Sequence, residues 1–529
     1  MPEYLTPGVY MEEFEIGARP IEGVSTSTAG TLGLTERGPE DLRFVSGFEE
    51  FKRIYGDYIP NSYLAHGVQG FFANGGQRCF VGRIVANNAV ATTADMGTVN
   101  IIASGKGDWG NRIAIKIEPG SQDDTIAPPR NKIKLTVMYW KVMPPLPLVD
   151  PFDPANATNQ NRREPNIVEV YDNLEANQTS IDYYENRINL QSVLIRLRRL
   201  GNNNPPDQAL TLLSAIGGAT PGSDGGPVDL ADYHGRQFIL NPQEPDATKQ
   251  ITINTGFLAL IANENISIVF IPDHHNVPGL TDEIILHCTQ MGDRFAVLHT
   301  NPATDSLANV GNLRPPQDTR NAAYYFPWIQ AYDPRIYQNA LMPPSGHIAG
   351  IYAKTDVERG VHKPPANETI QGATGLQYQI TKANQALLNP RGVNCLRIFP
   401  GRGLRVWGAR TCSTNTLWKY INVRRLFLYV EKSIEKGTQW VVFEPNNEKL
   451  WARVVATITQ FLTGVWRDGA LMGTKPEEAF FVKCDRSTMT QDDIDNGRLI
   501  CVIGIAPVKP AEFVIFRIAQ WAGGSAATE

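Results

Sequence analysis

The stretch Ile266-Ser267-Ile268-Val269-Phe270-Ile271 decides the fold class of this 529-residue chain. Its length and its β-branched residues are typical of a strand that is buried in a parallel sheet. A helix is predicted next, over residues 282–291, and a second strand over residues 294–299. This strand–helix–strand spacing predicts a crossover between two parallel strands, and therefore an α/β unit around it.

Toward the N-terminus, two helices and a strand are predicted before the pattern changes. Ser46-Gly47-Phe48-Glu49 is typical of a capping box at the start of a helix. A second helix is predicted over 63–73 and a strand over 79–85. From about residue 90 to residue 230, apolar and polar residues alternate, as at Ile113, Ile115 and Ile117, which predicts half-buried strands. We interpret this part as an inserted, solvent-facing β-rich domain.

Toward the C-terminus, two amphipathic helices are predicted over 420–437 and 447–466, and strands over 498–505 and 512–518. The second helix carries two apolar stripes, so both must be buried. In the last strand Phe513 and Ile515 would face one way, and Val514, Phe516 and Ile518 the other. An unpaired terminal strand with two apolar faces favours aggregation unless another sheet receives it.

Both ends of the chain therefore suggest strand exchange, since residues 4–14 also have an extended pattern. If each copy donates its tails to the next copy, the contact is head-to-tail and builds a helical filament or tube. The alternative is that the tails pack on their own domain.

Charge is spread unevenly along a chain whose net charge is only −5, which argues against a dedicated nucleic-acid binder. With 42% apolar and 19% charged residues, the chain can bury a sizeable core. Residues 369–430 contain no acid, whereas they hold nine bases. These bases could pair with the acidic N-terminal part of the chain or with an acidic protein surface, and nucleic acid is a weaker alternative.

No cofactor, metal or catalytic residue is predicted. Gly105 to Gly110 match a G-x-G-x-x-G loop, but a strand pattern follows where a dinucleotide loop requires a helix. Asp273-His274-His275 follows the buried strand, yet adjacent histidines in a strand point apart and no third ligand has a suitable spacing. Ser345 is read as a helix N-cap, the alternative being a serine nucleophile.

The six cysteines have no C-x-x-C spacing and are predicted to be buried, reduced thiols. The sequence also lacks the pattern of a signal peptide or of an apolar membrane span. Synthesis in the cytoplasm is therefore expected.

Several short motifs, in order, resemble one known family. They are Leu5-Thr6-Pro7-Gly8-Val9-Tyr10-Met11-Glu12-Glu13, Phe71-Phe72-Ala73-Asn74-Gly75-Gly76, Trp109-Gly110-Asn111 and Pro343-Pro344-Ser345-Gly346-His347-Ile348-Ala349-Gly350. Together these motifs resemble the contractile tail sheath proteins of bacteriophages and related contractile injection systems. The similarity is strongest from Asn394 to Thr411 and in the helices that follow.

The resemblance implies a multidomain α/β and α+β fold with a subtilisin-like α/β core that has lost catalysis. By residue, it implies an N-terminal linking arm (1–28), a first part of the core (29–90), the inserted outward-facing β-rich domain (91–230), the subtilisin-like core (231–365), a C-terminal domain facing an inner tube (366–510) and a C-terminal linking arm (511–529). The arm residues expected to link subunits are Leu5, Val9, Tyr10, Met11, Phe513, Val514, Ile515, Phe516 and Ile518.

The resemblance also implies a six-start helical homo-oligomer, assembled in the bacterial cytoplasm around a rigid inner tube. This sheath would be extended and metastable, and its contraction would drive the tube through a target envelope. Baseplate proteins and a terminator or cap protein are the other expected partners, with no nucleic acid and no direct membrane insertion. Candidates for contact with the tube are Lys449, Arg453, Arg402, Arg405, Arg424 and Arg425.

Three points stay open from the sequence. A catalytically degenerate subtilisin-like hydrolase that uses Ser345 is one alternative function. A nucleic-acid-binding module over residues 369–430 is another. The sequence also does not distinguish a phage tail from an injection system or a bacteriocin.

Overall fold

A computed structural model describes residues 20–122, 132–239, 250 and 252–517 of the chain. The chain divides into two compact units. The larger unit comprises Ser25–Glu358 and Pro365–Ile421, and the smaller comprises Met1–Val24, Arg359–Pro364 and Asn422–Glu529. Each unit has its own hydrophobic core, so each is described separately.

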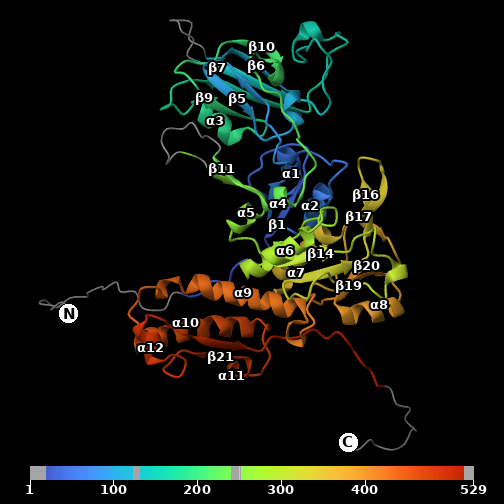
Figure 1. Cartoon of the computed structure of the whole chain (residues 1–529), viewed down its shortest axis with the longest axis vertical. Coiled ribbons are helices and arrows are strands. Elements are labelled where there is room, and N and C mark those ends of the chain that lie inside the picture. Colours follow the sequence, from blue (N-terminus) through green and yellow to red (C-terminus); the bar gives the residue numbers. More distant parts are fainter. Residues whose placement is uncertain (1–19, 123–131, 240–249, 251, 518–529) are drawn as a thin grey trace, which may run out of the picture. The chain divides into compact units, whose positions relative to one another are not determined.

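An eight-stranded mixed sheet forms the centre of the larger unit (Figure 1). Its order is β2 (Arg43–Val45), β3 (Cys79–Arg83), β1 (Ala29–Gly33), β13 (Ile268–Val269), β14 (Phe295–His299), β15 (Ala322–Phe326), β19 (Val393–Phe399) and β20 (Gly403–Trp407). All neighbours from β3 to β19 are parallel, whereas β2 and β20 are antiparallel additions at the two ends. The α/β prediction from residues 266–271 is confirmed: β13 is a central strand, and Ile266, Phe270 and Ile271 are completely buried.

Three helices of this unit lie on predicted segments, namely α1 (Phe48–Tyr55), α2 (Leu64–Ala73) and α6 (Leu280–Met291). A fourth, α7 (Ser345–Arg359), begins at Ser345, where a helix start was expected. The short helices α4 (Leu230–His234), α5 (Gly256–Ile261) and α8 (Lys382–Leu388) were not predicted. The predicted capping box of α1 is wrong by one residue, because Gly47 is the N-cap and carries no side chain. Instead, the Ser46 hydroxyl and backbone N–H both donate to the Glu50 carboxylate, at 2.7 and 2.8 Å.

The strands predicted by alternation between residues 90 and 230 form two small sheets. One contains β4 (Thr93–Asp95), β5 (Val99–Ala103) and β9 (Ile195–Arg199), and the other β10 (Gln208–Leu212), β6 (Ile113–Pro119), β7 (Ile133–Tyr139) and β8 (Ile167–Leu174). Helix α3 (Tyr184–Gln191) and Trp109 complete their common core. Shorter sheets elsewhere in the unit pair β11 (Gln237–Ile239) with β12 (Thr252–Asn254), and β17 (Gln338–Met342) and β18 (Ala373–Leu376) with β16 (Ile329–Asp333).

The motif at residues 343–350 has a packing role at the contact of α7 with α2. A Cβ atom on Gly346 would lie 2.2 Å from the Gly67 carbonyl oxygen, and one on Gly350 would lie 2.3 Å from the Phe71 carbonyl oxygen. Contacts below 3 Å are not tolerated, so both positions need glycine for the two backbones to approach this closely. The two glycines of the motif therefore let α7 cross α2 in close contact.

We expect Gly346→Ala to destabilise the larger unit by about 2 kcal/mol, because the added methyl group forces α7 away from α2. Chemical unfolding followed by circular dichroism measures the change. Gly464→Ala is the matched control, since Gly464 lies in a helix and a Cβ atom there meets nothing within 4 Å. That control is expected to be neutral or slightly stabilising. Equal stability of the two variants would contradict the packing role.

The smaller unit is built on two helices and a two-stranded sheet. Its elements are α9 (Ile421–Gly437, whose first residue belongs to the larger unit), α10 (Glu448–Arg467), α11 (Pro476–Ala479), α12 (Gln491–Asp495), β21 (Phe480–Lys483) and β22 (Val502–Ile505). The prediction that α10 is buried on two sides is confirmed, since Leu450 and Val454 of one stripe and Trp451 and Leu462 of the other all lie in the core. Asn447 caps the helix by accepting from the N–H groups of Lys449 and Leu450.

The boundary between the units differs from the predicted one. The C-terminal domain was expected to begin at residue 366, but residues 365–421 group with the larger unit. The reason is the hairpin of β19 and β20, which extends the eight-stranded sheet. Pairing within this one sheet therefore keeps residues 365–421 with the larger unit.

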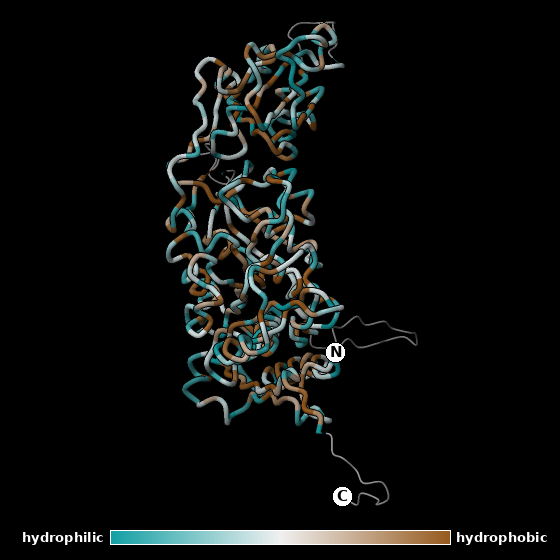
Figure 2. The backbone as a smooth tube through the Cα atoms, turned by 90° about the vertical axis from the view of Figure 1, so that its right-hand side faces the viewer, coloured by the Kyte–Doolittle hydropathy of each residue, from teal (hydrophilic) through white to brown (hydrophobic). Residues whose placement is uncertain are grey.

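No helix in the described ranges is both long and apolar enough to cross a membrane. Figure 2 shows that hydrophobic and hydrophilic residues alternate over short distances along the chain.

Candidate functional site

An exposed apolar segment ends the described part of the smaller unit. Phe513, Val514, Ile515 and Phe516 are 71%, 67%, 79% and 83% exposed. Residues 511–517 form no strand in the single chain, contrary to the strand predicted over 512–518. Four consecutive apolar residues this exposed are rare on a soluble protein and mark an interaction surface. The other predicted arm residues, Leu5, Val9, Tyr10, Met11 and Ile518, lie outside the described residues.

A two-stranded sheet in the same unit offers open edges. β21 and β22 are antiparallel, with Phe480 opposite Ile505 and Lys483 opposite Val502. Among the described residues no third strand joins this sheet. Phe481 and Val502 are 56% and 44% exposed on it. A two-stranded sheet is only marginally stable alone, and its edges present unpaired backbone groups to another strand.

β21 was not predicted from the sequence, whereas β22 lies within the strand predicted over 498–505. β21 is only four residues long and follows the single turn of α11. The available signal was the run Phe480-Phe481-Val482, placed soon after Pro476.

In the basic segment 369–430, three arginines donate their described hydrogen bonds to neutral oxygen atoms. Arg397 donates to the Gln385 side-chain oxygen at 2.8 Å, and Arg405 donates to the Asn367 carbonyl at 2.6 Å. Arg402 donates to the Asn367 side-chain oxygen at 3.1 Å. Among the described residues these three arginines have no carboxylate partner, so their charges remain available to an acidic surface.

The candidates for tube contact fall into two groups. Lys449, Arg453, and Arg402 are exposed, and Arg405 is partly exposed. Arg424 and Arg425 are each only 3% exposed, and Arg424 lies 3.4 Å from the Glu431 carboxylate. Their burial corrects the expectation that these two arginines face a partner, because the run of basic residues continues onto the buried side of α9.

Ser345 does not have the surroundings of a nucleophile. It is the first residue of α7 and completely buried, so the N-cap position predicted for it is also wrong. Its hydroxyl has no hydrogen-bond partner among the described residues. A catalytic serine needs a base within hydrogen-bond reach, and Ser345 has none there.

Three histidines meet at the carboxyl ends of β13 and β14, where a third partner for His274-His275 was not expected. His274 Nε2 lies 3.2 Å from His299 Nδ1, and His299 Nε2 lies 3.4 Å from His275 Nδ1. The Thr281 hydroxyl lies 2.8 Å from His274 Nδ1, so the imidazoles form a chain of neutral hydrogen bonds. Within the described ranges, no group of three or more His, Cys, Asp or Glu side chains is arranged to hold a metal ion.

A cavity of about 560 Å³ lies where the carboxyl ends of β1, β3 and β13 meet. Arg83, Asp273 and Tyr233 line it. Burial raises the pKa of Asp273 to about 6, although the Ser62 hydroxyl and the Tyr63 N–H donate to its carboxylate at 2.6 and 2.8 Å. No serine, cysteine or histidine lines this cavity, so it does not hold a Ser–His or Cys–His pair.

Comparison with protein families gives two adjoining matches. Residues 244–412 match the model described as phage tail sheath protein central domain, and residues 413–520 match the phage tail sheath C-terminal domain. Together the two matches cover just over half of the chain. The tail sheath protein of Escherichia phage P2 is 27% identical over 210 residues, which are 38% of this chain and 52% of that protein. The chain spans about half of the length, or less, of the curated relatives it matches first.

Solved structures of sheath proteins share the fold over nearly the whole chain. The helical sheath of the anti-feeding prophage in its contracted state has a TM-score of 0.56 and 23% identity, and the match covers 98% of this chain and 99% of that one. The sheath tail protein of Listeria innocua has a TM-score of 0.57 at 12% identity, with 92% and 96% covered.

Proposed function

Because this chain belongs to the contractile tail sheath family, we propose that it is a structural subunit that polymerises as a helical sheath around a rigid inner tube. The polymer forms in an extended, metastable state, and its contraction drives the tube through a target envelope. A phage tail and an injection particle both fit this role.

The observation that carries the proposal is the exposed segment Phe513 to Phe516. In a single chain it places four apolar side chains in water, which opposes solubility. In a polymer the same segment gains a sheet, and its backbone groups gain partners.

The β21–β22 sheet is the acceptor that we assign to it. Among the described residues no further strand pairs with its edges, and Phe481 and Val502 supply exposed apolar surface beside them. Each subunit would donate a tail and receive one, which gives a head-to-tail contact that does not close. The N-terminal arm around residues 4–14 is proposed as the second donor.

The contact with the inner tube is assigned to the exposed bases, namely Lys449 and Arg453 on α10, with Arg402 and Arg405 at the β19–β20 hairpin as the alternative. An acidic surface on the tube would pair with these bases. Baseplate and terminator proteins are the proposed partners at the ends of the sheath. Catalysis has no part in this role, and a subtilisin-like origin of the larger unit, supported by its parallel sheet, stays a prediction.

Negative-stain microscopy of the purified full-length chain tests the proposal. We expect striated tubes or short stacked rings at high protein concentration. A chain that stays monomeric at every concentration and salt condition would contradict it. A hydrolase would instead react with a fluorophosphonate probe at Ser345, and a nucleic-acid binder would bind DNA with a steep dependence on salt.

A further inference from the structure

We propose that Cys484 and Cys501 are a latent cross-strand disulfide that locks the β21–β22 sheet under oxidising conditions. The two residues are separated by sixteen others, so sequence spacing alone does not pair them. The structure brings them together at the end of the sheet where the connecting loop begins.

The strand register places the two cysteines opposite each other. Lys483 pairs with Val502 at the end of the ladder; Cys484 directly follows β21 and Cys501 directly precedes β22, so the register continued by one step sets them opposite each other. Residues directly opposite in antiparallel strands have Cα atoms about 4.5 to 5.5 Å apart. A disulfide accepts Cα separations of roughly 4.4 to 6.8 Å, so the backbone need not move far to form one. Each thiol is also among the groups that shift the pKa of the other, as expected for neighbouring side chains.

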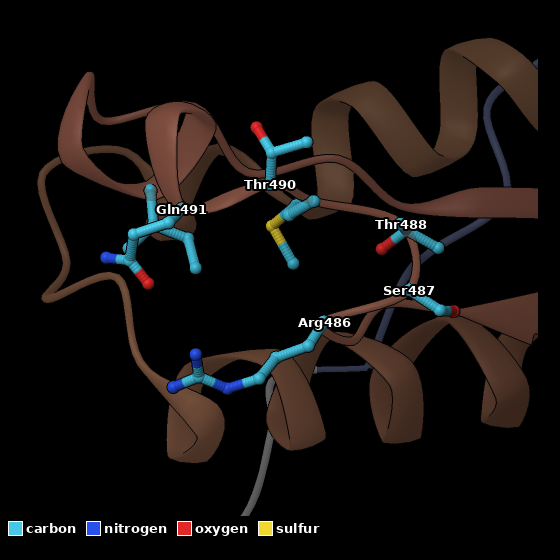
Figure 3. Close-up of a pocket in the computed structure, with 7 residues that line it drawn as sticks. Arg486, Ser487, Thr488, Thr490 and Gln491 are labelled. Atoms are coloured by element: carbon cyan, nitrogen blue, oxygen red, sulfur yellow. The ribbon is translucent and has the colours of Figure 1, made fainter.

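The connecting loop, residues 485–500, is ordered in a way that keeps the cysteines opposed. The Thr488 hydroxyl lies 2.8 Å from the Asp485 carbonyl oxygen and 2.9 Å from the Ile500 carbonyl oxygen, so its one proton is shared between acceptors at the two ends of the loop. The Arg498 N–H donates to the Asp493 carbonyl at 2.7 Å. The loop residues from Arg486 to Gln491 line a cavity of about 410 Å³. Figure 3 shows this cavity in close-up.

The surroundings of the pair make the thiols slow to react. Cys484 is buried in the core of the smaller unit, and burial raises its pKa. Burial raises the pKa of Cys501 to about 11, although Cys501 is more exposed. Only the thiolate attacks a disulfide, so the reduced form persists at neutral pH and oxidation proceeds slowly. Cys501, the more accessible of the two, is the residue that reacts first.

The oxidant is a low-molecular-weight disulfide such as oxidised glutathione. The Cys501 thiolate attacks one of its sulfur atoms and releases one glutathione thiolate, which leaves a mixed disulfide on Cys501. The Cys484 thiolate then attacks the Cys501 sulfur and releases the second glutathione. The protein loses two protons and two electrons, and one oxidised glutathione becomes two reduced ones. The new bond closes the loop and ties β21 to β22, which stabilises the sheet mainly by restricting the unfolded chain.

The test uses the unassembled full-length chain with oxidised glutathione at pH 8, so its outcome is independent of polymerisation. We expect the six thiols to fall to four, with a mass loss of about 2 Da and no bound glutathione. Non-reducing peptide mapping should then recover the peptides of Cys484 and Cys501 joined. The rate should rise about tenfold per pH unit between pH 7 and pH 9, because the thiolate fraction rises tenfold. The oxidised chain should unfold at a higher temperature, and dithiothreitol should reverse that shift.

Substitutions of single cysteines show which thiols form the bond. Cys501→Ser should abolish the loss of two thiols, and Cys484→Ser should instead trap a mixed disulfide at Cys501. Cys395→Ala and Cys412→Ala, in the larger unit, are matched controls that should still form the bond. Six persisting thiols in the wild-type chain, stable glutathione on Cys501, or a bond that joins other cysteines would each overturn the proposal, and none of these outcomes depends on whether a variant folds.

Discussion

Deletion of residues 511–529 is expected to leave a folded subunit that no longer polymerises. The described part of this segment makes no strand in its own chain, and its apolar side chains are exposed. Removing it therefore costs the fold little, whereas it removes the strand that we assign to the neighbouring subunit. Circular dichroism checks the fold, and light scattering with negative-stain microscopy checks assembly. Normal sheaths from the truncated chain would rule out strand donation by this tail.

Point substitutions separate strand donation from a general loss of apolar surface. If the tail becomes a strand, Phe513 and Ile515 share one face. Burial of one such side chain contributes about 2 to 3 kcal/mol. The double change Phe513→Asp and Ile515→Asp should therefore raise the protein concentration needed for assembly by roughly a hundredfold or more.

Val442→Asp is the matched control for this pair of changes. Val442 is 60% exposed in the same unit but lies outside the tail. It should assemble at the wild-type concentration. An equal defect in the control and in the tail variant would show that surface charge, and not the donated strand, governs assembly.

Local patterns in the sequence were enough to predict strands and helices whose own apolar residues show that they are buried. The run from Ile266 to Ile271 predicted a central strand because it is apolar throughout and β-branched. The two stripes of α10 predicted burial on two sides, and Leu450 and Leu462 confirm it. In each case the signal and the contact that it predicts lie within one element.

Predictions failed where residues far apart in the chain decide the outcome. His299 meets His274 because the carboxyl ends of parallel neighbouring strands lie at one edge of a sheet, which no sequence spacing shows. Arg424 and Arg425 belong to a run of bases, yet the face of α9 that they occupy is buried. The β21–β22 sheet was only half predicted, because four residues are too few for a reliable period.

The larger unit is expected to lose most of its stability as the pH falls from about 6.5 toward 4. Five histidines in it are at most 5% exposed, namely His66, His274, His287, His299 and His347. Burial lowers the pKa of His66, His287 and His347 to about 4 and that of His274 to about 3, and it lowers the pKa of His299 well below its usual value. The unfolded chain takes up protons near pH 6.5, well before the folded chain does, so acid favours unfolding.

The groups around His287 and His66 explain why the pKa values of these two histidines are low. His287 Nε2 lies 3.3 Å from an Arg294 guanidinium nitrogen, which donates to it, so a proton there would bring two positive charges together. His66 lies 3.6 Å from the Asp333 carboxylate, but Arg335 already occupies that carboxylate at 2.7 Å, and burial of His66 outweighs the attraction.

The size of the effect follows from linkage. A histidine with a folded pKa of about 4 loses about 2 kcal/mol of its contribution between pH 7 and pH 5. Asp273 opposes this trend, because its raised pKa lets it take up a proton in the folded state and regain about 1 kcal/mol at pH 5. Four or five histidines against one carboxyl group leave a net loss of several kcal/mol. This is comparable with the whole stability of a typical domain.

Chemical unfolding at pH 7, 6 and 5 measures the loss, and the slope of the unfolding free energy against pH gives the number of protons taken up. His287→Gln should lower that number by about one near pH 5, since the glutamine oxygen still accepts from Arg294 but does not titrate. His234→Gln is the control, because His234 lies half-exposed at the end of α4 and should leave the loss of stability intact. A stability that stays constant between pH 7 and pH 5 would mean that the buried imidazoles meet water or a counter-charge in the folded chain, contrary to their packing.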